Sequence, residues 1–267
     1  MQHEQMKQRR TCSGVGRLQA VVRHGSGVGV LVAVLLLPLT AAGQDTPEAL
    51  TTPDEDEVVE ALAATAPRAG DLDASFSDEG KVTTEFRDFA DAQALAIQPD
   101  RKILVAGNSA INGRFEDFTL ARYRSNGRLD STFNGTGKVT LDLQNNSLDD
   151  TQALAIQPDG KILVAGDAGS ASGVDFALVR YLPTGTLDST FGTDGKVFTD
   201  FEGRNDHAFA MALQPDGKMV VVGESAIPFG SGSAFALARY LPDGSPDPTF
   251  GTNGTVITDF GSGSSSH

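Results

Sequence analysis

The chain has 267 residues and a formal net charge of −14, with 35 acidic residues against 21 basic ones. A surface of this sign repels nucleic acid and anionic lipid, so neither is an expected partner. The single cysteine, Cys12, lies near the N-terminus, so the chain that follows it has no disulfide, thiol nucleophile or thiolate metal site.

Residues 1–43 have the organisation of a secretory signal peptide, with five basic residues, an apolar run at Val28–Leu39 and small residues at Thr40–Gly43. As a helix the apolar run would be ~18 Å long, too short for the ~30 Å hydrocarbon core of a bilayer, so a cleaved signal is favoured over a membrane anchor. We expect an exported protein, either periplasmic or extracellular and at the cell surface, with no stable membrane span after processing. Without this segment 16 basic and 34 acidic residues remain, a net charge of −18.

Residues 44–70 are predicted to be a solvated linker. They hold three prolines, the acidic cluster Asp54–Glu57 and no aromatic residue, so they offer too little apolar surface to offset the entropy of ordering. A short helix through Val58–Ala64 is the alternative. The Gly/Ser-rich tail at residues 261–267 is also expected to be flexible.

A single unit recurs three times between residues 71 and 260. Its most regular motif ends in a phenylalanine, and the four copies of that phenylalanine are 57, 58 and 59 residues apart. A Gly-X-Val segment follows each copy, and two further motifs recur in the same order. The copies are Phe76, Phe133, Phe191 and Phe250 for the first motif, Ala94–Gly107, Ala153–Gly166 and Ala210–Gly223 for the second, and Phe118–Tyr123, Phe176–Tyr181 and Phe235–Tyr240 for the third. Self-similarity at a fixed period of this size is typical of repeat architectures.

Each unit is predicted to contain four short β-strands. They are rich in aliphatic and aromatic residues and are bounded by Gly, Pro, Asp or Asn. In the second copy they are Gly137–Leu143, Ala153–Gln157, Lys161–Gly166 and Phe176–Tyr181. Three units of four strands and a closing strand at Gly254–Phe260 make thirteen strands in all.

The period and the strand number predict an all-β fold of propeller-like blades. Radially stacked four-stranded sheets cover one another, which suits strands that are apolar on both faces. A β-solenoid is the runner-up, although its shorter coils fit the period less well. Because a propeller usually needs at least four blades to close, three blades and one strand predict either a partial ring or a ring closed by a homo-oligomer.

A hairpin turn is predicted at Gln157-Pro158-Asp159-Gly160, where the glycine supplies a left-handed residue. The first copy has Arg101 at the position of Gly160 and Gly217. If the turn geometry is kept, the left-handed arginine costs ~1 kcal/mol.

Three segments of the second copy resemble the delta-60 repeat. They are Gln157–Gly166, Phe176–Tyr181 and Leu187–Gly192, and the resemblance extends over about residues 71–260. That family consists of predicted β-propeller repeats in exported or surface proteins of bacteria, without an established function. The resemblance therefore implies a fold and a compartment, and it implies no catalytic residue.

The most regular polar pattern is an arginine followed eight residues later by an aspartate. The pairs are Arg122 and Asp130, Arg180 and Asp188, and Arg239 and Asp247. The arginine shares a strand face with apolar residues, and a buried guanidinium needs a carboxylate or carbonyl partner, so structural ion pairs are expected. An anion site on each blade is the alternative, but a role present in every repeat is more often structural.

Acidic residues also gather before the second strand of each unit, at Asp91, Asp149, Asp150 and Asp206. Clustered carboxylates outside the cell suit calcium, although no known calcium-loop motif occurs. Calcium is therefore the one cofactor considered, and solvated loop acids are the alternative.

Catalytic motifs are missing from the sequence. His207 is the only histidine between the predicted signal and the last residue, and paired carboxylates of a glycosidase would have to come from different blades. We therefore predict that the protein is not an enzyme. An extracytoplasmic, glycosidase-like hydrolase and a structural envelope component are the alternatives.

The units differ most at the loops between their third and fourth strands. These are Asn108–Asp117, Asp167–Asp175 and Glu224–Ala234, with Phe115 and Phe229 as exposed apolar points. Variable loops on a repeated scaffold commonly carry recognition. The chain is thus predicted to be a binding or cell-surface interaction module for an extracellular ligand or protein.

Overall fold

The computed structural model describes residues 19–23, 31–35, 69–86, 88–110, 116–144, 147–170, 173–227 and 232–260. The chain divides into two compact units, Met1–Ala66 and Pro67–His267. In the first unit, strands β1 (Gln19–Arg23) and β2 (Leu31–Leu35) pair antiparallel. The rest of the predicted signal peptide, most of the linker and the predicted tail lie outside the described residues. Within the described part of the chain, no helix is long and apolar enough to cross a bilayer.

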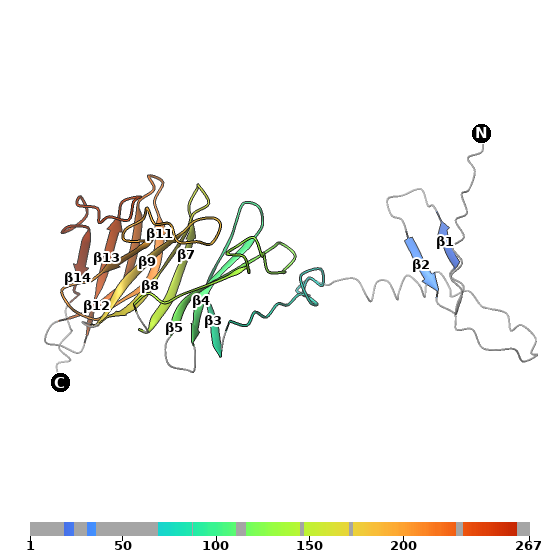
Figure 1. Ribbon diagram of the computed structural model, residues 1–267, viewed down its shortest axis with the longest axis horizontal. Helices are drawn as coiled ribbons and strands as arrows, with labels where there is room; N and C mark the ends of the chain where they lie inside the picture. The colour runs from blue at the N-terminus through green and yellow to red at the C-terminus, as the bar shows by residue number, and fades with distance from the viewer. Residues whose placement is uncertain are drawn as a thin grey trace, which may run out of the picture. The chain divides into compact units, whose positions relative to one another are not determined.

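The second unit contains three four-stranded antiparallel sheets, which we call blades 1, 2 and 3 (Figure 1). Blade 1 consists of β3 (Phe89–Ile97), β4 (Ile103–Ala110), β5 (Glu116–Tyr123) and β6 (Lys138–Leu141). Blade 2 consists of β7 (Asp149–Ile156), β8 (Ile162–Ser170), β9 (Gly173–Tyr181) and β10 (Lys196–Thr199). Blade 3 consists of β11 (Asp206–Leu213), β12 (Met219–Ala226), β13 (Ser233–Tyr240) and β14 (Thr255–Thr258).

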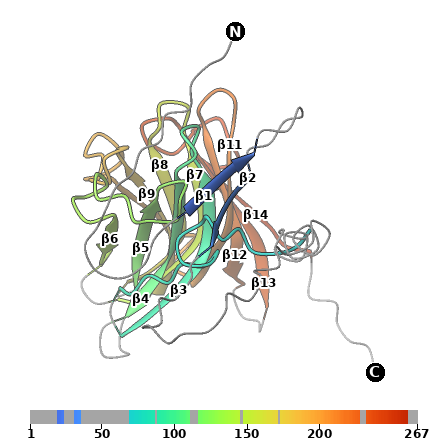
Figure 2. The same cartoon turned by 90° about the vertical axis from the view of Figure 1, so that its right-hand side faces the viewer.

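Strands pair in chain order within each blade, as the four strands of blade 1 show in Figure 2. Such antiparallel meanders confirm the all-β, propeller-like prediction and disagree with a solenoid, whose coils stack in parallel. Among the described residues of 69–260, no strand of one blade is hydrogen-bonded to a strand of another, and no closure of a ring is detected.

The boundaries of the repeat differ from the prediction by one strand. The Gly-X-Val strand ends a blade instead of beginning one, because β6 folds back on β5 and places Val139 opposite Leu120. The first such segment, Gly80–Val82, forms no strand, and its Lys81 makes only an isolated bridge with Asp78. Of the thirteen predicted strands, the first is therefore absent from the described part of residues 69–260, whereas the closing strand at Gly254–Phe260 is present as β14.

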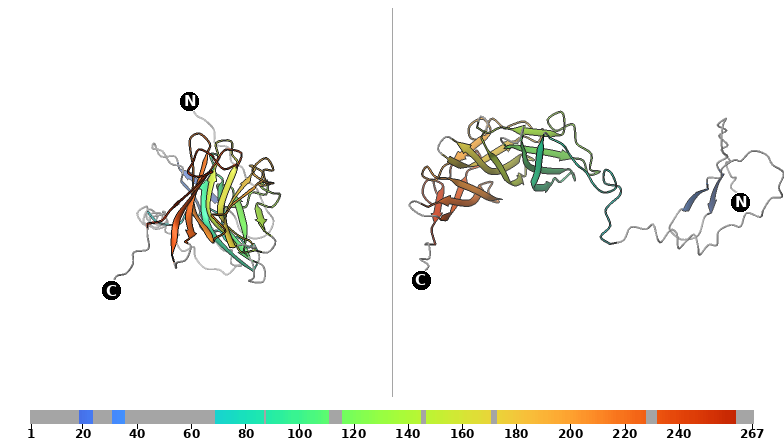
Figure 3. Two further views of the ribbon diagram at one scale, coloured as in Figure 1. Left: turned by 90° about the vertical axis from the view of Figure 1, so that its left-hand side faces the viewer. Right: turned by 90° about the horizontal axis from the view of Figure 1, so that it is seen from below.

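Two apolar clusters fill the space between successive blades, which follow one another in the right-hand view of Figure 3. We call the side of a blade that meets the next blade its rear face, and the opposite side its front face. Leu104 on the rear of blade 1 and Val164 on the front of blade 2 belong to the first cluster. Leu163 on the rear of blade 2 and Met219 on the front of blade 3 belong to the second. Because neighbouring residues of β8 enter different clusters, the strand is apolar on both faces.

Residues 71–86, here called the N-terminal strap, lie against the front face of blade 1. The hydroxyl of Tyr123 donates a hydrogen bond to Oγ1 of Thr84 at 2.6 Å. The equivalent pair between blades 2 and 3 is Thr199 and Tyr240, whose hydroxyls are also 2.6 Å apart. The strap thus takes on blade 1 the position that the last strand of a preceding blade takes on blades 2 and 3.

Two local features keep the repeated backbone. Arg101 has a φ of 67°, close to the 83° of Gly160 in the same turn, so the predicted left-handed arginine is confirmed. In β8, a Cβ atom added to Gly166 would lie 2.0 Å from the carbonyl oxygen of Asp150 on β7. Gly166 pairs with Thr151, at the point where β7 bulges between Thr151 and Ala153.

Candidate binding site

The rear face of blade 3 exposes aromatic side chains whose equivalents in blade 2 are buried. Phe176 and Phe201 pack edge to face with ring centroids 4.9 Å apart and are 1% and 3% exposed. Phe235 and Phe260 repeat this arrangement at 5.0 Å but are 61% and 75% exposed. The difference arises because blade 3 covers the first pair, whereas no described residue covers the second.

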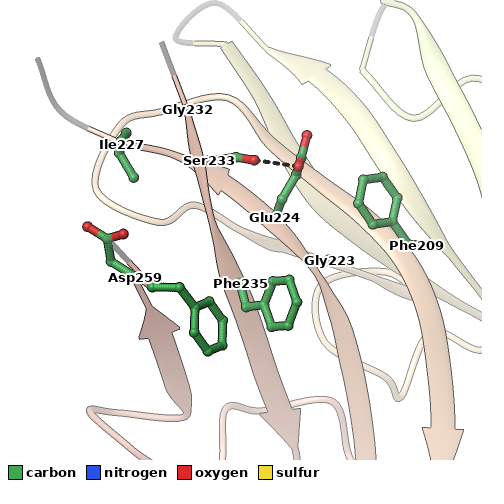
Figure 4. A pocket seen from close by; sticks show the side chains of 9 residues that line it. Phe209, Gly223, Glu224, Ile227, Gly232, Ser233, Phe235 and Asp259 are labelled. Carbon is green, nitrogen blue, oxygen red and sulfur yellow. Dashed lines mark hydrogen bonds between the residues drawn. The ribbon is translucent and has the colours of Figure 1, made fainter. Parts of the chain in front are cut away.

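A pocket of about 200 Å³ opens on this rear face (Figure 4). Its apolar lining includes Phe209 from β11 and Phe235 from β13, with Ile227 after β12. Two carboxylates, those of Glu224 and Asp259, also line it. The pocket therefore combines aromatic surface with negative charge.

In blades 1 and 2, the residue at the repeat position of Glu224 contacts the next blade. In blade 1 the equivalent Asn108 accepts a hydrogen bond from the backbone N–H of Thr151 at 2.7 Å. In blade 2 the equivalent Asp167 accepts one from the backbone N–H of Ala208. The Glu224 carboxylate instead accepts a hydrogen bond from the hydroxyl of Ser233 at 2.6 Å, as the dashed line in Figure 4 shows.

The Asp167 carboxylate also lies 2.8 Å from Nδ1 of His207. Burial raises the pKa of Asp167 to about 6, against the lowering effect of the hydrogen bonds with His207 and Ala208. His207 thus contacts Asp167 across the boundary between blades 2 and 3. Among the described hydrogen bonds, none joins His207 to a hydroxyl that could act as a nucleophile.

The predicted variable loops are shorter than the sequence suggested, because the flanking strands extend into them. Asn108 lies within β4, Asp167 within β8 and Glu224 within β12, each paired with the following strand. Phe115 and Phe229 lie outside the described residues. Of the three loops, Glu224–Ala234 is the one that contributes to the pocket.

Each predicted arginine lies against its predicted aspartate. The Nε–Oδ2 distances are 3.0 Å for Arg122 and Asp130, 2.9 Å for Arg180 and Asp188, and 2.9 Å for Arg239 and Asp247. A phenylalanine ring lies under each guanidinium, at 4.3 to 4.6 Å from its centroid. A lysine contacts the aspartate as well, as Lys161 does Asp188 at 3.2 Å. With carboxylate, ring and lysine around it, each guanidinium has a structural environment rather than an open anion site.

The four aspartates considered for calcium separate into two kinds. Asp91 and Asp150 accept hydrogen bonds from Asn108, through its backbone N–H and its side-chain amide respectively. Asp149 and Asp206 are fully buried and begin β7 and β11, where each lies in a group of three aspartates at a blade boundary. The other members of the two groups are Asp117 and Asp142 beside Asp149, and Asp175 and Asp200 beside Asp206.

Sequence reasoning missed Phe209, Phe235 and Phe260 as surface residues. The repeat partners of Phe235 and Phe260 in blade 2 are core residues, so their residue types predict burial, whereas Phe209 stands at the position of the polar Gln152. No local motif signals the difference, because exposure here depends on which blade packs against the face.

The comparison with known families agrees with this architecture. Three segments, residues 98–133, 157–191 and 214–250, match the family described as "Domain of unknown function (DUF5122) beta-propeller". Each segment extends from the turn before the second strand of a blade to the phenylalanine under the arginine. No curated protein matches the chain. The comparison thus shows β-propeller repeats of unknown function and leaves the activity to the geometry of the site.

Proposed function

We propose that this protein is an exported, non-enzymatic binding module whose partner docks on the open rear face of blade 3. The exposure of Phe235 and Phe260, against the burial of Phe176 and Phe201 at the same repeat positions, carries the proposal. Burying a large apolar side chain contributes ~1.5–3 kcal/mol, so this face gains free energy when it is covered. The delta-60 resemblance of the same repeats supports the exported location.

A second copy of the chain is disfavoured as the occupant. Its blade 1 would place Asp91 opposite Glu224, at the position where His207 faces Asp167, so two carboxylates would meet. The strap also holds the position beside Tyr123 that β14 of an incoming blade would need. Both features favour a partner other than this chain.

An extended segment with alternating apolar and basic side chains fits the open face best. Asn108 and Asp167 accept backbone N–H groups of an adjoining strand, so Glu224 is placed to do the same for a bound strand. Apolar side chains of that strand would cover Phe235, and a lysine or arginine would offset the charges of Glu224 and Asp259.

Binding of three peptides of equal length tests this chemistry: alternating Leu-Lys, Ser-Lys and Leu-Glu. Calorimetry on the purified protein should detect binding of the Leu-Lys peptide and of neither other peptide. Added salt should weaken this binding, because it screens the attraction between lysine and the carboxylates. Phe235→Ser should weaken it at least ~10-fold, since ~1.5 kcal/mol of apolar burial is lost. Phe198→Ser is the matched control, because Phe198 is an exposed phenylalanine on β10, away from the pocket.

Equal binding of the Leu-Lys and Ser-Lys peptides would mean non-specific attraction and would overturn the proposed site. A two-chain mass by light scattering that Phe235→Ser reduces to one chain would identify a second copy as the occupant. Turnover in a panel of glycoside and ester substrates would overturn the non-enzymatic assignment.

A further inference from the structure

Two groups of three aspartates lie at equivalent places in the repeat. Cluster A consists of Asp117, Asp142 and Asp149, and cluster B consists of Asp175, Asp200 and Asp206. In each cluster, one carboxylate oxygen from every residue lies within 4.8 Å of one from both others. The two sets match position by position, because Asp117 and Asp175 lie on the third strand of their blades and Asp142 and Asp200 directly follow the fourth.

Each cluster joins two blades. Cluster B takes Asp175 and Asp200 from blade 2, whereas Asp206 is the first residue of β11 in blade 3. Blade 3 keeps Asp259 at the position of Asp200 but has Ala234 in place of Asp175. The complete set therefore occurs where one blade meets the next and is lost on the blade whose rear face is open.

Asp206 has one carboxylate oxygen without a hydrogen bond of ordinary geometry, although the hydroxyl of its cross-strand neighbour Ser225 lies near enough to oppose the rise that burial causes in its pKa. The residue is fully buried, and its Oδ2 accepts a hydrogen bond from the backbone N–H of Phe201 at 2.7 Å. Its Oδ1 is buried and has no hydrogen-bond partner among the described residues. Within the same part of the chain, no lysine or arginine forms an ion pair with any residue of cluster B. A buried carboxylate oxygen without a donor, beside two further carboxylates, calls for a cation.

The oxygen positions suit calcium. Calcium binds oxygen at 2.3–2.6 Å, so two ligands of one ion are at most ~5 Å apart, and the three oxygens of each cluster lie inside that limit. Transition metals prefer histidine or cysteine ligands, and neither cluster contains one. Asp200 is exposed to solvent, which leaves room for the water ligands that complete a calcium shell.

We propose that cluster B binds one calcium ion, which links the third and fourth strands of blade 2 to the first strand of blade 3. The burial of Asp206 supports the assignment, because a cation offsets the charge that packing of the blades removes from water. The proposal does not extend to cluster A, because both carboxylate oxygens of Asp149 accept hydrogen bonds, from the backbone N–H of Leu143 and from the hydroxyl of Ser147. The ion thus holds blades 2 and 3 together where this chain has no disulfide to do so.

Calcium titration of the EDTA-treated protein by calorimetry measures the number of sites. We expect one ion per chain in the wild type and none in Asp175→Asn. Asp117→Asn is the matched control, because it removes the equivalent aspartate from cluster A, and it should retain the ion. Thermal unfolding should show a calcium-dependent rise in Tm in the wild type and in Asp117→Asn, and no such rise in Asp175→Asn.

Absence of calcium binding at millimolar concentration would overturn the proposal, as would an ion retained in Asp175→Asn. Magnesium, added as a comparator, should bind more weakly because it demands shorter, octahedral coordination. If a buried substitution prevents folding, Asp200→Asn tests cluster B through an exposed residue and should also abolish calcium binding.

Discussion

The guanidinium of Arg122 donates a hydrogen bond to the carbonyl oxygen of Pro183 at 2.6 Å, and this contact crosses from blade 1 to blade 2. Arg180 donates the equivalent bond to the carbonyl oxygen of Pro242 in blade 3. The same arginines pair with Asp130 and Asp188 inside their own blades. The repeated arginine therefore has two roles, closing the turn of its own blade and holding the following one.

Asp188→Ala should destabilise the protein by about 3 kcal/mol, because it leaves the buried Arg180 without its carboxylate. Asp247→Ala is the matched comparison. It should cost less, since the Arg239 side chain is 20% exposed and no following blade supplies a carbonyl oxygen among the described residues. Urea unfolding of both variants measures the difference in the free energy of unfolding. Equal losses of stability would show that the contact of Arg180 with Pro242 in the next blade does not contribute to it.

Arg101→Gly should stabilise the protein by about 1 kcal/mol, because glycine adopts the left-handed conformation without steric strain. The reverse change in the same turn of blade 2, Gly160→Arg, should destabilise by a similar amount. Chemical denaturation provides both values. A loss of stability in Arg101→Gly would mean that the arginine side chain contributes more than the strain it causes.

Gly166→Ala should destabilise by about 3 kcal/mol or more, because the added Cβ would overlap the carbonyl oxygen of Asp150 and force β7 and β8 apart. Gly232→Ala is the control, since the nearest atom to its added Cβ is the flexible Cδ1 of Ile227 at 3.2 Å. A thermal shift assay separates the two. Similar Tm values would contradict the close approach of the two strands.

Stability should fall steeply as the pH drops from about 4 to 2. Burial alone would raise the pKa of Asp130, but hydrogen bonds from Thr132 and the charges of Arg122 and Lys102 lower it to about 2. The unfolded carboxyl has its ordinary pKa of 3.8, so the folded state binds fewer protons in this interval and loses stability as the pH falls through it. Tm measured against pH checks this. In Asp130→Asn the slope between pH 4 and 2 should decrease, and an unchanged slope would exclude Asp130 as a cause.

Much of the fold was predictable from local sequence. The positions of β8 and β9, the turn at Gly160 and the pairing of Arg180 with Asp188 follow from motifs that recur at a fixed spacing. Short-range geometry determines such features, because strands, turns and fold-back pairs involve residues close together in the chain. The assignment of Val139 to the second unit was wrong, because a motif repeat has no inherent starting point and only strand pairing, here with Leu120 of blade 1, defines one.

The candidate sites depended on tertiary structure to different degrees. Asp149 and Asp206 stood out by sequence, but their partners Asp117 and Asp175 lie on the preceding blade and became neighbours only through packing between blades. The open rear face was likewise hidden, because Phe235 begins nearly the same motif, Phe235–Tyr240, as the buried Phe176 does in Phe176–Tyr181.

The sequence by itself determined the repeat, the strand content and the chemistry of each repeated pair, since these are encoded in residues near one another. The tertiary structure alone decided which faces are covered, which aspartates meet and where the strap lies. The physical reason is that burial and charge proximity depend on what packs against a residue, and identical motifs acquire different surroundings at the middle and at the end of a stack of blades.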